Sequence, residues 1–229
     1  MSTIIVREYL DRQIHQIQDE ILLLGNMVEH AMQTVIEALA TSDVEAARRV
    51  YENDLVINGK RFAIENAILI VIATQQPIAH DLRLLAAMLE IITELERMGD
   101  YAKGIAKIII RLDNKFIPMP IQELTEMSNK AVSMLHRGLK AFINENYNQA
   151  IIIPREDDEV DDLYNQVYRL TTKAMIENPE SIDDANYIMW IAHNIERMAD
   201  RVTNICERTV FIATGELFEM DINDDEDME

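Results

Sequence analysis

Two pairs of carboxylates recur at the same spacing and could hold a cation. Glu96 and Asp100 lie four residues apart, and Glu196 and Asp200 repeat that pair one hundred residues further along the chain. On an α-helix this spacing puts both side chains on one face, about 6 Å apart along the axis. Each pair continues a column of apolar or small residues, so its carboxylates should be half-buried. Two such carboxylates repel each other unless one is protonated, paired with a basic residue or bridged to the other by a cation. Carboxylates are the ligands of hard cations such as Mg²⁺, and the pattern therefore indicates a metal site.

A second helical segment in each half could complete these sites. Asp54 with Asn58, and Asp157 with Asp161, have the same four-residue spacing. One cluster per half would require the two helices to face each other through these columns. The predicted metal ligands are Glu96, Asp100, Glu196, Asp200, Asp157, Asp161 and Asp54. The ion could be iron, manganese, magnesium or zinc, and the sites could also lack a metal.

The arginines beside the pairs offer a simpler explanation. Arg97 and Arg197 each lie three residues before Asp100 and Asp200, close enough on a helix for an ion pair. Charged helix faces of this kind are common on protein surfaces. The recurrence of the pair at equivalent places in both halves favours a site, and both interpretations stay open.

Groups for other kinds of catalysis are not found in the sequence. No histidine has a Glu three residues before it, which excludes the E-x-x-H motif of ferritin-like di-iron bundles. The six glycines form no phosphate-binding loop, and the single cysteine, Cys206, is typical of a small core residue. We therefore predict a protein that is not an enzyme. A carboxylate-bridged metalloenzyme and a cation-binding bundle without a signalling role remain as alternatives.

The chain repeats itself with a period of about one hundred residues. An offset of 103 places the apolar pattern of residues 21–39 on that of residues 124–142. Beyond Pro77 and Pro179 the offset becomes 100, and six residues of one half are then identical in the other. They are Ile91, Glu96, Arg97, Met98, Asp100 and Ile105, which match Ile191, Glu196, Arg197, Met198, Asp200 and Ile205. A single register over this length indicates an internal duplication.

The elements that carry these residues are long helices. Only 6 Gly and 5 Pro interrupt the 229 residues, while 48% are hydrophobic, which disfavours a β-sandwich and a disordered chain. Apolar residues at three- and four-residue steps predict three helices per half, and small Gly99 and Ala199 would let a neighbouring helix approach closely. The predicted helices are Tyr9–Thr41, Asp43–Gln75, Ala79–Leu112, Ile121–Asn144, Tyr147–Glu177 and Ile182–Thr214. The fold prediction is all-α, with two tandem, pseudo-symmetric three-helix bundles.

The sequence divides into three predicted parts, namely two bundles and a C-terminal tail. Residues 1–113 are predicted to form the first bundle and residues 114–216 the second, joined by a linker over residues 113–120 that holds two of the five prolines. Residues 217–229 are predicted to be an acidic C-terminal tail, solvated or disordered.

The net charge limits the partners. The charge of −20 and pI near 4.5 disfavour nucleic acid and an anionic membrane surface, which attract basic proteins. No apolar run is long enough to span a bilayer, and the N-terminal residues lack the apolar core of a signal peptide, so we expect a cytoplasmic protein.

Several spaced motifs resemble those of the PhoU family. They are QPIAHDLRL (76–84), ERMGD (96–100), ERMADRVTNIC (196–206), GNMVE (25–29) and REDDEVD (155–161), and the resemblance extends from about residue 9 to residue 215. It implies two three-helix bundles and a cytoplasmic negative regulator of phosphate uptake and the phosphate-starvation response. Such a regulator would be an adaptor between the ATPase subunit of the phosphate ABC transporter and a sensor histidine kinase. The resemblance also implies a homodimer and, in some members, metal clusters on E/D-x-x-x-D motifs.

Two residues depart from the family pattern. Asn58 stands where a strict motif would have Asp, which removes one charge from the first cluster, and Ala199 replaces a Gly. The first cluster is therefore expected to bind a cation less well than the second.

Overall fold

The regular structure of the described residues is entirely helical. A computed structural model describes residues 2–113, 120–217 and 219–220, with side chains for residues 7–113, 120–180, 182–217 and 219–220. The elements are α1 (Ser2–Thr41), α2 (Val44–Gln75), α3 (His80–Leu112), α4 (Ile121–Ile143), α5 (Tyr147–Ile152), the 3-10 turn η1 (Ile153–Glu156), α6 (Asp157–Glu177), the 3-10 turn η2 (Pro179–Ser181) and α7 (Ile182–Thr214). The first helix begins at Ser2, earlier than the predicted Tyr9.

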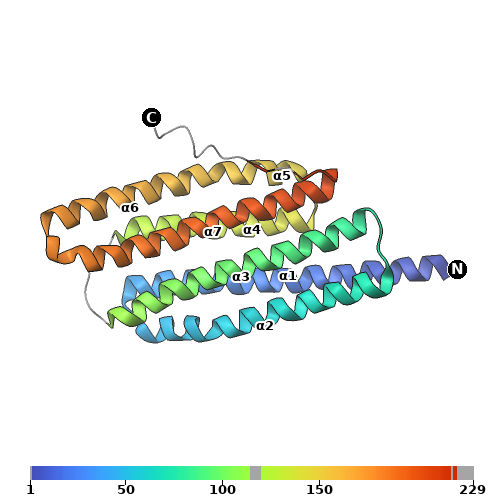
Figure 1. Ribbon diagram of the computed structural model, residues 1–229, viewed down its shortest axis with the longest axis horizontal. Coiled ribbons are helices and arrows are strands. Elements are labelled where there is room, and N and C mark those ends of the chain that lie inside the picture. Colours follow the sequence, from blue (N-terminus) through green and yellow to red (C-terminus); the bar gives the residue numbers. More distant parts are fainter. Residues whose placement is uncertain (1, 114–119, 218, 221–229) are drawn as a thin grey trace.

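The helices form two bundles that lie side by side with their long axes roughly aligned (Figure 1). Helices α1–α3 make the first bundle and α4–α7 the second, and the bundles meet where α3 packs on α7 and α1 on α4. Buried residues of both bundles belong to one continuous apolar cluster. The predicted fold of two pseudo-symmetric three-helix bundles is therefore confirmed. The centre of the predicted linker, residues 114–119, lies outside the described residues.

The start of α2 and its connection to α3 follow from local chemistry. Asp43 caps the start of α2, because its side chain accepts a hydrogen bond of 2.9 Å from the backbone N–H of Ala46. After Gln75 the chain turns around Pro77, and Gln76 and Ala79 take positive φ angles of 48° and 47°. The helices then pack closely at Gly99, where a Cβ atom would lie 3.1 Å from Ile57 Cγ2. The predicted close approach at Gly99 is thus confirmed for α2 and α3.

The fifth predicted helix, Tyr147–Glu177, is wrong as a single element. Pro154 lacks a backbone N–H, and its ring clashes with the carbonyl four residues earlier in a regular α-helix, so it kinks or breaks the helix. The chain instead forms α5, the turn η1 and then α6. The break makes Asp157 the first residue of α6, with Asp158 and Glu159 in the same turn. Acidic residues there are stabilised by the partial positive charge of a helix N-terminus.

The single cysteine and the start of the tail lie against the second bundle. Cys206 is fully buried, which confirms it as a core residue, and burial raises the pKa of its thiol to about 12. After Gly215 the chain returns along α7, where the backbone N–H of Met220 donates to Glu207 Oε1 at 2.8 Å. The predicted acidic tail from residue 221 onward lies outside the described residues.

Candidate functional site

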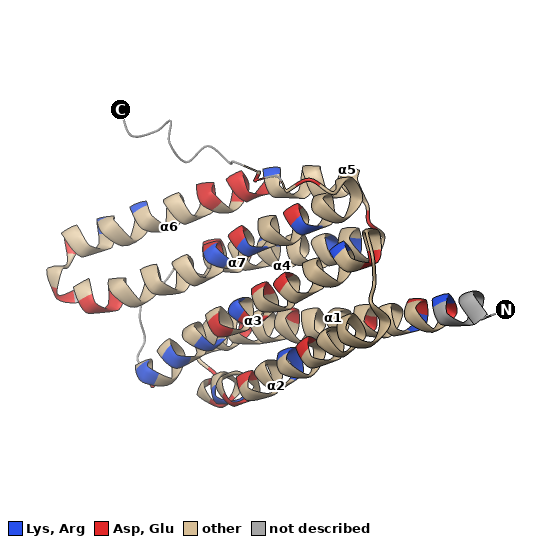
Figure 2. Ribbon diagram, turned by 45° about the vertical axis from the view of Figure 1, so that its right-hand side comes forward, with Lys and Arg blue, Asp and Glu red and all other residues tan. Residues whose placement is uncertain are grey.

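The second acidic cluster gathers Asp157, Asp161, Glu196 and Asp200 between α6 and α7. Asp157 is only 5% exposed. Burial, and after it the negative charges of Asp200, Asp161 and Glu196 in that order, raise the pKa of Asp157 from 3.8 to about 8. The structure therefore brings together the four ligands predicted for the second half. Acidic residues are conspicuous on the α5 end of α6 and on α7 in Figure 2.

Asp157 carries a buried oxygen without a hydrogen-bond donor among the described residues. Asp157 Oδ1 is inaccessible to solvent and has no hydrogen-bond partner among the described residues. Beside Glu196 of the same cluster, His193 Nδ1 lies 3.2 Å from Glu196 Oε2, and the rings of Tyr164 and His193 have centroids 6.5 Å apart. Burial and the charge of Glu196 raise the pKa of Tyr164. A buried carboxylate oxygen without a donor, beside other carboxylates, is suited to a cation.

The first acidic cluster consists of Asp54 on α2 with Glu96 and Asp100 on α3, and it already contains a cation. Lys103 Nζ lies 2.6 Å from Asp54 Oδ2, which also accepts a hydrogen bond of 3.0 Å from Asn58 Nδ2. Asp54 is 1% exposed, so the ammonium group neutralises a buried charge. The hydrogen bond to Asp54 in turn raises the pKa of Lys103.

Burial and neighbouring negative charges also raise the pKa values of Glu96 and Asp100. Burial is the main reason why both carboxyl groups have a raised pKa, and the charge of Asp54 contributes to each. Asp100 also raises the pKa of Glu96, while Lys103 at 3.8 Å lowers that of Asp100. The three carboxylates predicted for the first half are therefore neighbours.

The two clusters fit a metal ion unequally. Lys103 occupies the position of a counter-ion in the first cluster, whereas the charges that act on Asp157 in the second cluster are all carboxylates. Among the described side chains, no three His, Cys, Asp or Glu residues already converge in a geometry ready to hold a metal. The donor set of the second cluster fits a hard cation, and the first carries a built-in ammonium instead.

The two arginines beside the carboxylate pairs, Arg97 and Arg197, contact residues other than the predicted aspartates. Arg97 forms its ion pair with Glu94 at 3.7 Å, and Arg197 donates from Nε to the Tyr101 hydroxyl at 3.2 Å. Neither contact is the predicted ion pair with the aspartate three residues later. Arg197 also lies over the Tyr101 ring, with 5.7 Å between the guanidinium carbon and the ring centroid.

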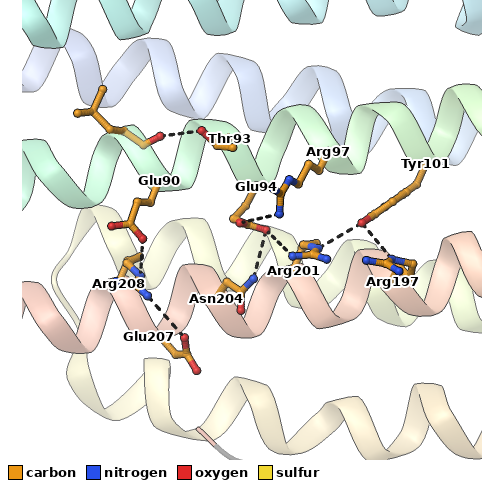
Figure 3. Close-up of polar contacts among 11 residues, drawn as sticks. Glu90, Thr93, Glu94, Arg97, Tyr101, Arg197, Arg201, Asn204, Glu207 and Arg208 are labelled. Atoms are coloured by element: carbon orange, nitrogen blue, oxygen red, sulfur yellow. Dashed lines mark hydrogen bonds and ion pairs between the residues drawn. The ribbon is translucent and has the colours of Figure 1, made fainter. Parts of the chain in front are cut away.

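These contacts belong to a polar seam between the bundles, formed by Glu94 and Tyr101 on α3 with Arg197, Arg201 and Asn204 on α7 (Figure 3). Arg201 donates to Tyr101 Oη at 3.2 Å and to Glu94 Oε2 at 3.4 Å. Asn204 Nδ2 donates to the same Glu94 oxygen at 3.2 Å. The seam was not predicted from the sequence, because its partners lie about one hundred residues apart.

Replacing Arg201 by Met tests how much the seam contributes to stability. The side chains of Arg201 and Glu94 are only 17% and 13% exposed, so their contact is largely shielded from water. We expect the free energy of unfolding in urea to fall by about 2 kcal/mol. Arg97→Met is the matched control, because Arg97 contacts the same glutamate from a side chain that is 50% exposed, and its loss should cost less than about 0.5 kcal/mol. Equal losses for the two variants would contradict the role given to the seam.

The fold and the paired carboxylates define a class of all-helical proteins built from two similar three-helix bundles. The family model described as "PhoU domain" matches residues 21–109 and again residues 124–209. The chain belongs to the PhoU family.

Relatives agree over nearly the whole chain. The accessory protein PhoU homolog of the phosphate-specific transport system of Clostridium acetobutylicum is 33% identical over 95% of this chain and 99% of its own length. The PhoU of Escherichia coli is 32% identical over 90% of this chain and 86% of its own length. The crystal structure of the regulatory protein PhoU from Streptococcus pneumoniae has a TM-score of 0.85 and 31% identity, covering 92% of this chain and all of that one.

These relatives are named as accessory or regulatory proteins, not as enzymes, which agrees with the prediction that this chain is not an enzyme. None of the described helices is long and apolar enough to cross a membrane.

Proposed function

We propose that this protein is a cytoplasmic regulator of phosphate uptake that acts by binding. It would restrain the phosphate-starvation response by connecting the ATPase subunit of the phosphate transporter with a sensor histidine kinase while phosphate is plentiful. The observation that carries the proposal is the agreement with accessory and regulatory proteins of phosphate transport over at least nine tenths of the chain.

The second acidic cluster supplies a means of regulation. A divalent or iron-type cation there would be held by Asp157, Asp161, Glu196 and Asp200, and its charge would offset the repulsion that raises the pKa of Asp157. A metal in the first cluster would compete with Lys103 for Asp54. Cation occupancy is therefore proposed chiefly for the second bundle.

Helix α7 could pass a change at this cluster to the other bundle. Glu196 and Asp200 belong to the cluster beside α6, while the next residues, Arg197 and Arg201, donate to Tyr101 on α3. A small shift of α7 on cation binding would thus move both the cluster and the seam. Such coupling requires two arrangements of the bundles that differ in affinity for a partner.

A reporter of a phosphate-starvation promoter tests the proposed function. In phosphate-rich medium, deletion of the gene should raise reporter expression, and expression of the intact chain should restore repression. The double variant Glu196→Ala/Asp200→Ala should restore it less well, while the exposed-site variant Asp158→Asn should restore it fully. Unchanged reporter expression after deletion would leave only a cation-binding bundle without a signalling role.

A further inference from the structure

Equivalent positions of the two repeats meet at the polar seam between the bundles. Residues 97 and 101 on α3 correspond to residues 197 and 201 on α7, because the offset between the halves is 100 in this region. These positions hold Arg97, Tyr101, Arg197 and Arg201, so all but one of them carry a positive charge. Figure 3 shows the Tyr101 hydroxyl between the guanidinium groups of Arg197 and Arg201. The repeat therefore gathers arginines from both bundles around one tyrosine.

Two of these arginines share one neutral oxygen. Arg197 and Arg201 both donate from Nε to Tyr101 Oη, each at 3.2 Å. A phenol oxygen can accept both hydrogen bonds, but it neutralises neither charge. Among the described residues, Arg197 has no ion pair, and the bond to Tyr101 is its one recorded hydrogen bond. The other N–H groups of this guanidinium can therefore bind a further acceptor.

The single carboxylate of the seam, Glu94, lies at a long distance from its two arginines. The distances are 3.4 Å from Glu94 Oε2 to Arg201 Nη1 and 3.7 Å from Glu94 Oε1 to Arg97 Nη1. Hydrogen bonds between such charged groups are usually about 2.7–2.9 Å long. Three arginines beside one glutamate leave a local excess of positive charge, although the chain as a whole has a net charge of −20.

The arginines are partly shielded from water, which strengthens their attraction for an anion. The side chain of Arg201 is 17% exposed and Arg197 is half-buried, whereas Arg97 is 50% exposed and leaves the group open to solvent. The carboxylates of the two acidic clusters lie on other sides of the same helices, where α3 faces α2 and α7 faces α6. An anion could thus reach the guanidinium groups without entering either acidic cluster.

We propose that Arg97, Arg197 and Arg201 bind a phosphate-type oxyanion at the seam. A guanidinium group suits such an anion because two of its N–H groups can bind two oxygens at once. The anion would contact α3 and α7 together, so its binding would stabilise one arrangement of the two bundles. The presence of an anion site follows from charge and geometry, while the choice of phosphate among the oxyanions rests on the proposed function.

Calorimetric titration of the full chain with inorganic phosphate at constant ionic strength tests the site. The unaltered protein should bind phosphate saturably, and Arg197→Gln should weaken the binding by about tenfold or more, because hydrogen bonds to a charged group are lost. Arg208→Gln is the matched control, since it removes the same charge from the same helix. Arg208 pairs with Glu90 at 3.0 Å outside the site, so its loss should leave the affinity for phosphate unchanged.

Titration with phosphoserine identifies the source of the anion. Tighter binding of inorganic phosphate would mean that the site takes the free ion, and tighter binding of phosphoserine would mean that it takes a phosphate group carried by a larger molecule. Unfolding in urea provides a second measurement in case Arg197→Gln is itself less stable. Phosphate should stabilise the unaltered protein and Arg208→Gln, and should have little effect on Arg197→Gln.

Two results would overturn the proposal. One is that neither inorganic phosphate nor phosphoserine binds saturably in the millimolar range. The other is an equal loss of affinity in Arg197→Gln and Arg208→Gln, because this would show general charge attraction in place of a site. Since the titration contains no partner protein, either result would leave the proposed adaptor role intact.

Discussion

Replacing Asp157 by Asn should stabilise the protein at pH 8 by about 5 kcal/mol in chelator-treated buffer, while the two proteins should have similar stability near pH 4. The pKa of Asp157 is about 8 in the folded protein and 3.8 in an ordinary aspartate. Between these values the folded state retains a proton that the unfolded state has released, so the free energy of unfolding falls as pH rises. Asparagine has the same shape without a charge, and the fall should largely disappear.

Asp158→Asn is the control for this experiment, because it removes the same charge from the neighbouring exposed residue. Urea unfolding of the three proteins at pH 4, 6 and 8 gives the comparison. If Asp157→Asn is no more stable than Asp158→Asn at pH 8, burial and charge repulsion do not destabilise the ionised form of Asp157. Adding a divalent cation at pH 8 should stabilise the unaltered protein and have a smaller effect on Asp157→Asn.

Replacing Lys103 by Met should destabilise the protein by about 3 kcal/mol at pH 7. The ammonium group is the ion-pair partner of Asp54, which is 1% exposed. Its removal leaves a buried charge with the hydrogen bond from Asn58 Nδ2 as the one side-chain contact recorded among the described residues. The double variant Lys103→Met/Asp54→Asn should recover much of the loss, because it removes the stranded charge as well.

Lys107→Met provides the matched control, since Lys107 lies one turn further along α3 and is exposed. Its loss should change the free energy of unfolding by less than about 0.5 kcal/mol. A Lys103→Met protein as stable as Lys107→Met would mean that Lys103 does not neutralise the first cluster. Divalent cations should also stabilise Lys103→Met more than the unaltered protein, because they could replace the missing charge.

The helices and the cluster membership followed from the sequence because both depend on local spacing. Apolar residues at three- and four-residue steps identify the buried face of a helix, whichever element covers that face. The internal duplication also shows the same pattern twice in the sequence. The same spacing placed Glu96 with Asp100, and Glu196 with Asp200, on single helix faces. Their meeting with Asp54 and Asp157 required only that adjacent helices pack through those faces.

Features that depend on distant contacts were missed. Lys103 reaches Asp54 from a different helix, and the sequence contained only a weak signal, a lysine three residues after Asp100. The break at Pro154 is a local feature and was missed for another reason, because the apolar periodicity on either side of the proline predicts one continuous helix. The direction taken by Arg97 and Arg197 depends on how α3 and α7 meet, which no local pattern specifies.

The two halves therefore differ in a way that the repeat alone does not predict. The offset of 103 aligns Asp54 with Asp157, but Asp54 lies inside α2 beside a lysine, and Asp157 begins α6 beside three carboxylates. The equivalent acidic pairs thus form a cluster neutralised by a lysine in the first bundle and a cluster of carboxylates in the second. The second cluster is where a regulatory cation is expected.

Binding of the purified chain to the transporter's ATPase subunit tests the adaptor proposal most directly. Titration with fluorescently labelled subunit, with and without a divalent cation, should show a saturable complex that Glu196→Ala/Asp200→Ala weakens and Asp158→Asn does not. The same assay with the cytoplasmic part of the sensor kinase should also give a complex. A folded chain that binds neither protein under any of these conditions would contradict the account.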